Sequence, residues 1–360
     1  MIDGQPYLAH KENGDCIYLD PETTLCRLEV RFGHAAKPLG CRLFPYQLSR
    51  VLPKVVSAGI RLDCLAAQQN KGPLMTDQRE QIVKLAREME LVGESSGTAL
   101  GGLHSDTAIQ LTESFAGFFS DDTDPAVGSL SLLLAARHFA ELGTDFLNDR
   151  ATMREILPPL LEKFRHRAGA ELAQTKSLGA MDRLFFRLWL GNYLRRDEEL
   201  IGQTRRRLRR MFDFTAILFG GGNLRHLGSE HPNLSLRQAG MFERRFTEPS
   251  APSVWECWRR FARGRLRTLQ FFGESVQGAN FFVGLKRLAT LFALVNAAAK
   301  VNAVASSRAN KLEAADVEYA VGVIDHAYGR SAVLRLRPHR FVEGQFFDVS
   351  RYASALSSFC

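Results

Sequence analysis

From Thr76 onward, apolar residues recur at a spacing close to the period of an α-helix that buries one face. The segment TDQREQIVKLAREMELV (76–92) begins with an N-cap residue and carries its apolar positions on one side. Further helical patterns follow at 107–119, 127–148, 151–168, 180–196, 198–213, 254–272, 279–307 and 313–329. Since strands do not alternate with these helices, we expect residues 76–360 to form an α-helical domain without a parallel sheet.

The first 75 residues lack this periodicity. Prolines and glycines interrupt most windows, and only CIYL (16–19) and VVSAGIRL (55–62) have the pattern of short β-strands. A region this short and this interrupted buries little apolar surface, so a bound metal would help to hold it together. We therefore expect a mostly α protein with two parts, a small loop-rich cysteine domain on 1–75 and a large helical domain on 76–360.

The most apolar segment is FFVGLKRLATLFALVNAAAKVNAVA (281–305), which Lys286, Arg287 and Lys300 interrupt. Its uncharged runs are shorter than the about 20 residues that a transmembrane helix needs, so we expect a buried helix and no transmembrane segment. The start, MIDGQPYLAHKENGD, has neither a basic n-region nor an apolar stretch. These features favour a cytoplasmic protein.

The net charge of +8 is concentrated in two arginine-rich runs, TRRRLRR (204–210) and RRFARGRLR (259–267), with five arginines each. Such runs attract acidic proteins, nucleic acid or lipid headgroups when they lie on a surface. The run 204–210 is not accompanied by a helix-turn-helix or interleaved aromatic pattern, so we do not expect nucleic acid as a partner. The two interpretations that remain are a solvated helix face and a docking site for an acidic partner.

Four of the six cysteines, Cys16, Cys26, Cys41 and Cys64, lie in the first part, separated by 9, 14 and 22 residues. Four thiolates suffice for a tetrahedral zinc ion or an iron–sulfur cluster. The spacing lacks the close ligand pairs of a zinc ribbon, so both metals stay open. The alternative interpretation is that these are buried, inert thiols.

Basic residues surround the four cysteines and would lower the pKa of the thiols and offset thiolate charge: Arg27, Arg31, Lys37 and Arg42. We expect Arg42 to donate to a ligand sulfur or to pair with an acidic neighbour such as Asp20. Pro38 and Pro45 would stiffen the loop that carries Cys41, and His34 is an alternative ligand.

Three other features have simpler interpretations than a functional site. The glycine-rich FTAILFGGGN (214–223) lacks the spacing of a nucleotide-binding loop and reads as a turn. His226 and His231, in the same irregular region, are interpreted as ordinary polar residues. The apolar stripe in MDRLFFRLWLGNYL (181–194) and Cys257 in VWECWRR are expected in the core, while Cys360 is expected to be exposed.

The sequence segments around the cysteines also resemble a known family. These segments are GDCIYLD (14–20), Cys26, FGHAAKPLGCRLFPYQL (32–48), and Cys64 followed by NKGPL (70–74). Together they resemble the bacterial cysteine-cluster family described as a zinc- or iron-chelating domain, whose named member is flagellin lysine-N-methylase. The resemblance covers about residues 10–75. It implies that Cys16, Cys26, Cys41 and Cys64 are the metal ligands.

One departure from the family pattern concerns the start of the chain. Family members carry a further Cys-x-x-Cys-x-x-Cys-Cys cluster upstream, whereas the residues before Cys16 contain no cysteine. We expect either that the start is truncated and further ligands precede it, or that four ligands complete the site.

The leading functional hypothesis is binding of zinc or iron, including an iron–sulfur cluster. The resemblance also implies an enzymatic alternative, a protein-lysine N-methyltransferase that uses S-adenosylmethionine on flagellin or a similar protein substrate, although no S-adenosylmethionine motif is present. The third hypothesis is a non-catalytic adaptor that binds an acidic partner through its arginine-rich runs. No catalytic or cofactor-binding residue is assigned.

Overall fold

The computed structural model describes residues 11, 15–91, 97–194, 223–224, 234–235, 246, 251–306 and 311–359. Within them the chain is mostly helical. The helices are α1 (Arg27–Phe32), α2 (Leu39–Leu43), α3 (Leu65–Gln68), α4 (Arg79–Glu88), α5 (Ser105–Ala116), α6 (Pro125–Glu141), α7 (Thr144–Asn148), α8 (Arg150–Gln174), α9 (Ala180–Tyr193), α12 (Glu256–Arg267), α13 (Phe281–Ala305), α14 (Ala314–Ala327), α15 (Arg337–Gln345) and α16 (Val349–Phe359). The strands are β1 (Tyr46–Leu52), β2 (Val55–Ile60), β3 (Asn223–Leu224) and β4 (Leu234–Ser235).

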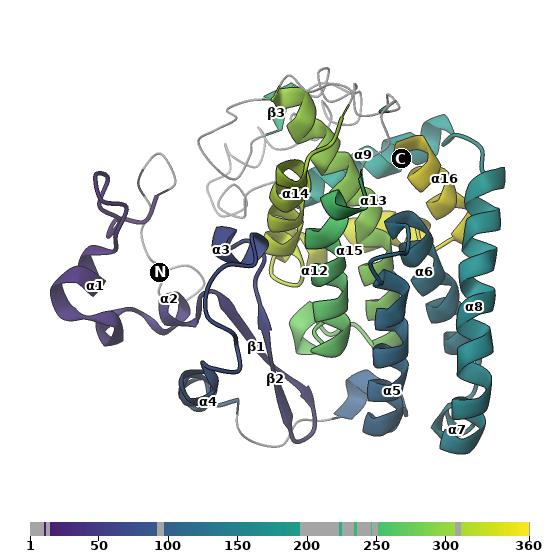
Figure 1. The fold of residues 1–360 in the computed structure, drawn as a ribbon, viewed down its shortest axis with the longest axis horizontal. Helices are drawn as coiled ribbons and strands as arrows, with labels where there is room; N and C mark the ends of the chain where they lie inside the picture. Colours follow the sequence, from purple (N-terminus) through teal and green to yellow (C-terminus); the bar gives the residue numbers. More distant parts are fainter. Residues whose placement is uncertain are drawn as a thin grey trace.

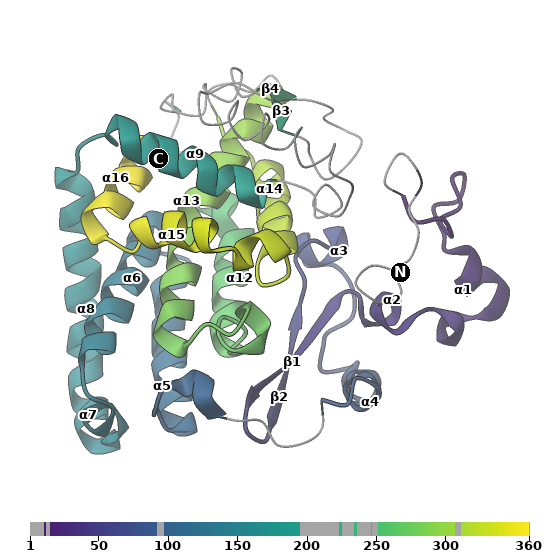
Figure 2. The ribbon, with the colours of Figure 1, turned by 180° about the vertical axis from the view of Figure 1, so that it is seen from behind.

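The long helices form a bundle around α13, with the β1–β2 hairpin on one side and α1 and α2 beyond it (Figure 1). Helix α13 packs against α6 and α14, and α6 packs in turn against α8. The view from behind shows α9 and α15 crossing the same bundle (Figure 2). The small cysteine-bearing part therefore lies at the edge of a helical body.

Helix α13 is the core helix that its composition predicts. Among the described residues, α13 is the single helix that has the length and the apolar composition to span a membrane. However, 89% of its most apolar window is buried by the rest of the fold. Its buried cation Arg287 donates to Glu343 of α15 over 2.8 Å. A charge on this helix is thus matched inside the protein, as a buried charge must be.

The hairpin is covered on both faces. Its antiparallel register pairs Tyr46 with Ile60, and a bulge interrupts the register between Arg50 and Leu52. Val51 and Leu52 belong to the main core. Leu48 belongs instead to a second, smaller cluster with Leu85 and Ala86 of α4. The hairpin is therefore a wall shared by two hydrophobic cores.

A buried carboxylate joins this hairpin to the helical body. Asp325 of α14 is fully buried and forms an ion pair with Arg265 of α12, which is 3% exposed. The other carboxylate oxygen of Asp325 accepts the backbone N–H of Leu62, just after β2, over 2.6 Å. Arg265 also donates to Gln47 of β1 over 2.7 Å. Three segments distant in sequence thus share one polar cluster.

Two glycines allow the close approach that this cluster requires. A Cβ at Gly59 of β2 would lie 2.4 Å from Oε1 of Gln270, whose amide donates to the carbonyl of Gln47 over 2.8 Å. A Cβ at Gly322 of α14 would lie 2.2 Å from the amide nitrogen of Gln68. A larger residue at either position would displace the amide of Gln270 or of Gln68, and with it the hydrogen bond to Gln47 or to Leu62.

Most helices confirm the periodicity of the sequence, whereas one predicted strand is wrong and several elements were missed. The strand predicted at 16–19 is wrong, because these residues form a turn. Strand β1 and the C-terminal helices α15 and α16 were not predicted. The helix predicted at 198–213 lies outside the described residues. The loop-rich small domain on 1–75 stays a prediction, because α4 packs on the hairpin across its proposed boundary.

Removing the buried carboxylate should be costly. We expect Asp325→Ala to lower the free energy of unfolding by about 3–5 kcal/mol, because it leaves the buried Arg265 charge without its partner. Urea denaturation followed by circular dichroism measures this loss.

The matched control is the exposed pair Arg267–Glu113, whose side chains are 59% and 55% exposed. Glu113→Ala should cost less than about 1 kcal/mol. Similar losses in the two variants would contradict the central position that we give to Asp325.

Candidate metal centre

Cys16 and Cys26 lie on two segments held together by backbone hydrogen bonds. Cys16 opens a turn in which its carbonyl accepts the N–H of Leu19 over 2.9 Å. Leu19 then forms an antiparallel bridge with Cys26, and the N–H of Arg27 donates to the carbonyl of Tyr18 over 2.8 Å. The turn that replaces the predicted strand therefore places the Cys16 segment beside the start of α1.

Cys41 comes from a third segment, the short helix α2. Pro38 precedes this helix and Phe44 follows it in an extended conformation, as expected for a loop stiffened by proline. Burial raises the pKa of the Cys41 thiol, and the charges of Cys16 and Cys26 raise it further while Lys37 lowers it. Cys16 and Cys26 are therefore each within electrostatic reach of Cys41.

Cys64 occupies a different environment. It precedes α3, and its N–H donates to the carbonyl of Arg61 over 3.4 Å. Its charge is not among those that shift the pKa of Cys41. Within the described part of the chain, no three or more His, Cys, Asp or Glu side chains are already arranged to hold a metal ion.

The charged residues around the thiols pair mainly with one another. Glu29 of α1 accepts from Lys37 over 2.8 Å and contacts Nδ1 of His34 at 2.9 Å. These two hydrogen bonds lower the pKa of Glu29. Because His34 uses Nδ1 for Glu29, only its Nε2 is left for the alternative ligand role predicted from the sequence.

Arg42 corrects one sequence expectation. Its side chain pairs with Glu88 of α4 at 2.7 Å and donates to the carbonyl of Lys37 over 3.1 Å. Asp20, its predicted partner, pairs with Arg27 instead, at 3.3 Å. Arg42 therefore ties the loop of Cys41 to α4, and Arg27 ties the start of α1 to the turn after Cys16.

The segment that carries the three thiols has almost no core of its own. Helices α1 and α2 contain no fully buried residue. Val30 and Phe32 of α1 are 69% and 63% exposed, and Leu25 is also exposed. Apolar burial therefore contributes little to the stability of this segment.

An acidic residue next to Cys64 has a partner that the sequence did not reveal. Asp63 contacts Nδ1 of His326 in α14 at 3.1 Å and forms an ion pair with Arg61. Burial alone would raise the pKa of Asp63, but these hydrogen bonds and the charges of Arg61 and Arg330 hold it well below its usual range. Since Asp63 and His326 are 263 residues apart, no local motif connects them.

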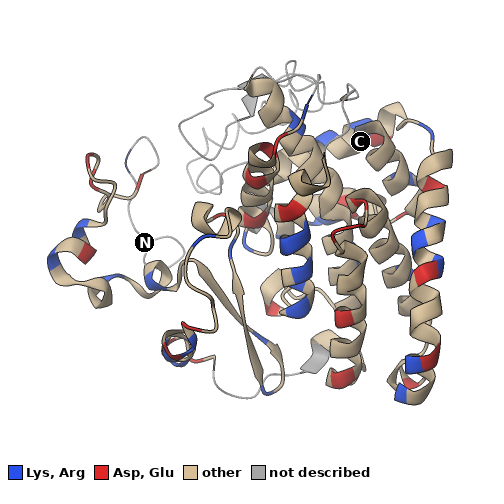
Figure 3. Ribbon diagram, viewed as in Figure 1, with Lys and Arg blue, Asp and Glu red and all other residues tan. Residues whose placement is uncertain are grey.

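The arginine run 259–267 forms most of α12, where Figure 3 shows a band of basic residues. Arg259 and Arg265 are buried, and Arg259 donates to the carbonyl of Pro252 over 2.7 Å. Arg263 pairs with Asp121 at 3.2 Å, and Arg267 pairs with Glu113. This run therefore stabilises the interior contacts of the fold and is not a free basic surface.

The remaining sequence candidates divide between the core and undescribed parts of the chain. Trp189 is fully buried and Cys257 is 3% exposed, which confirms both as core residues. The positions outside the described residues are the other arginine run (204–210), most of the glycine-rich stretch 214–223, His226, His231 and Cys360.

A scan against protein-family models matches nothing in this chain, and searches of curated proteins and of solved structures also return no match. The resemblance to the cysteine-cluster family stays a prediction that rests on the quoted residues.

The proximity of the thiols can be tested in metal-free protein. We expect Cys16→Ser and Cys26→Ser each to lower the pKa of Cys41, because each removes a negative charge near it. The rate of iodoacetamide labelling of Cys41 as a function of pH, mapped by mass spectrometry, reports this pKa. Cys64→Ser is the control and should leave the profile unchanged; an equal shift in all three variants would refute the arrangement.

Asp63 should make the free energy of unfolding depend on pH in the acidic range. Since its pKa is lower in the folded than in the unfolded protein, its stabilising contribution is complete above the unfolded value of about 3.9 and is lost as the pH falls toward the lowered folded value. Asp63→Asn should flatten the fall in unfolding free energy below pH 5, measured by urea denaturation. Glu113→Gln, at an exposed site, is the control and should show the same pH dependence of the unfolding free energy as the unmodified protein. If Asp63→Asn also kept this pH dependence, the assignment would be wrong.

Proposed function

We propose that this protein binds zinc or iron, including an iron–sulfur cluster, through Cys16, Cys26, Cys41 and Cys64. The observation that supports the proposal is that the charges of Cys16 and Cys26, which lie on two other segments, both act on the thiol of Cys41. Cys64, the fourth ligand expected from the sequence, would complete the site by joining them.

The electrostatics of the three thiols favour a bound cation. In the absence of metal, burial and neighbouring thiolates raise the pKa of Cys41, so that its neutral form is favoured. A divalent or cluster-bound metal ion reverses this balance, because it stabilises several adjacent thiolates at once. Lys37, which already lowers the pKa of Cys41, would offset part of the remaining negative charge.

The packing of the same segment supports a structural role for the metal. Helices α1 and α2 have no fully buried side chains, so apart from the partly buried Leu39 and Leu43 of α2 the segment depends on backbone hydrogen bonds and on ion pairs such as Arg42–Glu88. Metal ligation would supply a cross-link among segments that hydrophobic burial leaves weakly joined. Binding would also draw the thiols into ligand distance, since no ready-made ligand set exists among the described residues.

Zinc and iron are distinguished by purification under anaerobic conditions, followed by metal analysis and an absorption spectrum. A colourless, metal-loaded protein indicates zinc, whereas a broad absorption band in the blue region indicates an iron–sulfur cluster. Chelation should lower the thermal stability, because the metal binds only the folded protein.

Substitution of single cysteines tests the ligand set. We expect Cys41→Ser to abolish stoichiometric metal binding, because Cys41 is the thiol that links the other two. Cys64→Ser should weaken binding less, since three thiols remain close together. Metal content per chain, measured on anaerobically purified protein, gives the result.

Cys257→Ser is the matched control, because Cys257 is buried in α12 and its pKa is raised to about 12, mainly by burial. It should retain the full metal content. Unchanged metal content in Cys41→Ser, or a metal-free unmodified protein under these conditions, would refute the proposed function.

A further inference from the structure

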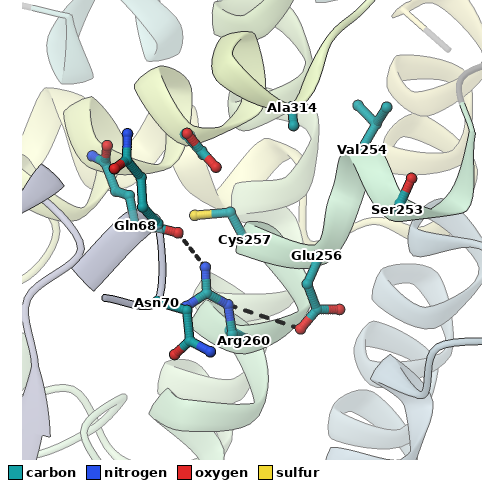
Figure 4. A pocket seen from close by; sticks show the side chains of 10 residues that line it. Gln68, Asn70, Ser253, Val254, Glu256, Cys257, Arg260 and Ala314 are labelled. Atoms are coloured by element: carbon teal, nitrogen blue, oxygen red, sulfur yellow. Dashed lines mark hydrogen bonds and ion pairs between the residues drawn. The ribbon is translucent and has the colours of Figure 1, made fainter. Parts of the chain in front are cut away.

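A cavity of about 230 Å³ lies where α3 and its following turn meet the helical body. Figure 4 shows its walls: Gln68 and Asn70 on one side, Cys257 and Arg260 of α12 opposite, and Ala314 of α14 at the top. Glu318 of α14 also lines it. The cavity uses none of the four cysteines of the proposed metal site.

The one cation of the cavity wall is already occupied. The terminal nitrogens of Arg260 donate to the carbonyl of Ala67, over 3.1 Å, and to that of Gln68. Its Nε lies 3.8 Å from Glu256, which also pairs with Arg263 at 3.1 Å. Arg260 therefore braces the end of α3 through its terminal nitrogens, while its Nε has no hydrogen-bond partner within the described ranges and shares the nearby carboxylate of Glu256 with Arg263.

Glu318 is the charge that the cavity leaves uncompensated. It is half-buried, and within the described ranges it has no ion pair. The neighbouring thiol of Cys257 does not add charge, because its pKa is raised to about 12. Burial is the main cause, Glu318 and other carboxylates raise the pKa further, and Arg260 lowers it. The lining thus carries a net negative charge, which disfavours an anionic ligand and favours a cation.

The remaining lining groups are neutral and polar. Gln68 is committed, since its amide nitrogen donates to the carbonyl of Leu62 over 2.6 Å. Gln69 and Asn70 contribute further amide groups at the open side, where Asn70 has a left-handed backbone conformation with φ of 53°. At about 30 Å³ per water molecule, the cavity has room for roughly seven to eight non-hydrogen atoms.

We propose that this cavity binds a small organic cation, a primary ammonium compound with a hydrogen-bonding group at its other end. Its ammonium group pairs with Glu318, and its polar end meets the amides of Gln69 and Asn70. Because such a ligand touches both α3 and α14, it strengthens the contact between the hairpin segment and the helical body. This inference is independent of metal binding.

A matched series of probes tests the charge requirement. 5-Amino-1-pentanol is the cationic probe, 1,5-pentanediol its neutral counterpart and 5-hydroxypentanoate its anionic counterpart. Isothermal titration calorimetry on the full chain should detect the cationic probe alone.

Two variants test whether the cationic probe binds in this cavity. Glu318→Gln keeps the shape of the side chain and should weaken the cationic probe about tenfold, the effect of one lost charge-assisted hydrogen bond. Ala314→Phe should fill the mouth and abolish binding, while Glu113→Gln on α5 should bind as the unmodified protein does. Circular dichroism checks that each variant is folded. Equal binding of the cationic and neutral probes, absence of any binding, or unchanged affinity in Glu318→Gln would overturn the proposal.

Discussion

The carboxylate of Asp325 is the contact on which the arrangement of the two parts depends. It holds Arg265 of α12 with one oxygen and the N–H of Leu62 with the other, so that helix, helix and hairpin meet at one buried group. A buried ion pair gains little net energy over apolar packing, but it is costly to break. Arg265 and Asp325 both belong to the helical body and pair with each other, so the part of this contact that fixes the hairpin is the second oxygen of Asp325, which would lose the N–H of Leu62 if the hairpin moved.

This arrangement explains how a cysteine-bearing segment with almost no core can keep a defined position. The helical body has a large apolar interior around α13, whereas α1 and α2 bury nothing completely. The segment is connected to the body through the hairpin, which reaches the main core by Val51 and Leu52. Apolar burial is thus highest at the hairpin and falls toward Cys16, where polar contacts take its place and a metal cross-link would have the greatest effect.

The sequence predicts the helices that are buried either on one face or on all sides. A helix with one buried face repeats its apolar positions, and α13 is apolar on all sides because it is enclosed. Strand β1 was missed because both of its faces are covered, so Leu48, Val51 and Leu52 do not alternate. Helix α16 contains several serines and is held by tertiary contacts, such as that of Tyr352 with the carbonyl of Ala289 at 2.7 Å. The Asp63–His326 pair needs the fold itself, as does the electrostatic effect of Cys16 and Cys26 on Cys41.

The shared hairpin wall has a consequence for any fragment of the chain. Leu48 packs against α4, while its neighbours in the same strand pack against the bundle. A cut after residue 75 would separate Leu48 from Leu85 and Ala86, and would also uncover the strand face that carries Val51 and Leu52. A fragment ending at residue 75 would therefore expose apolar side chains on both faces of strand β1. The hairpin thus makes the cysteine segment depend on the helices for its own apolar packing.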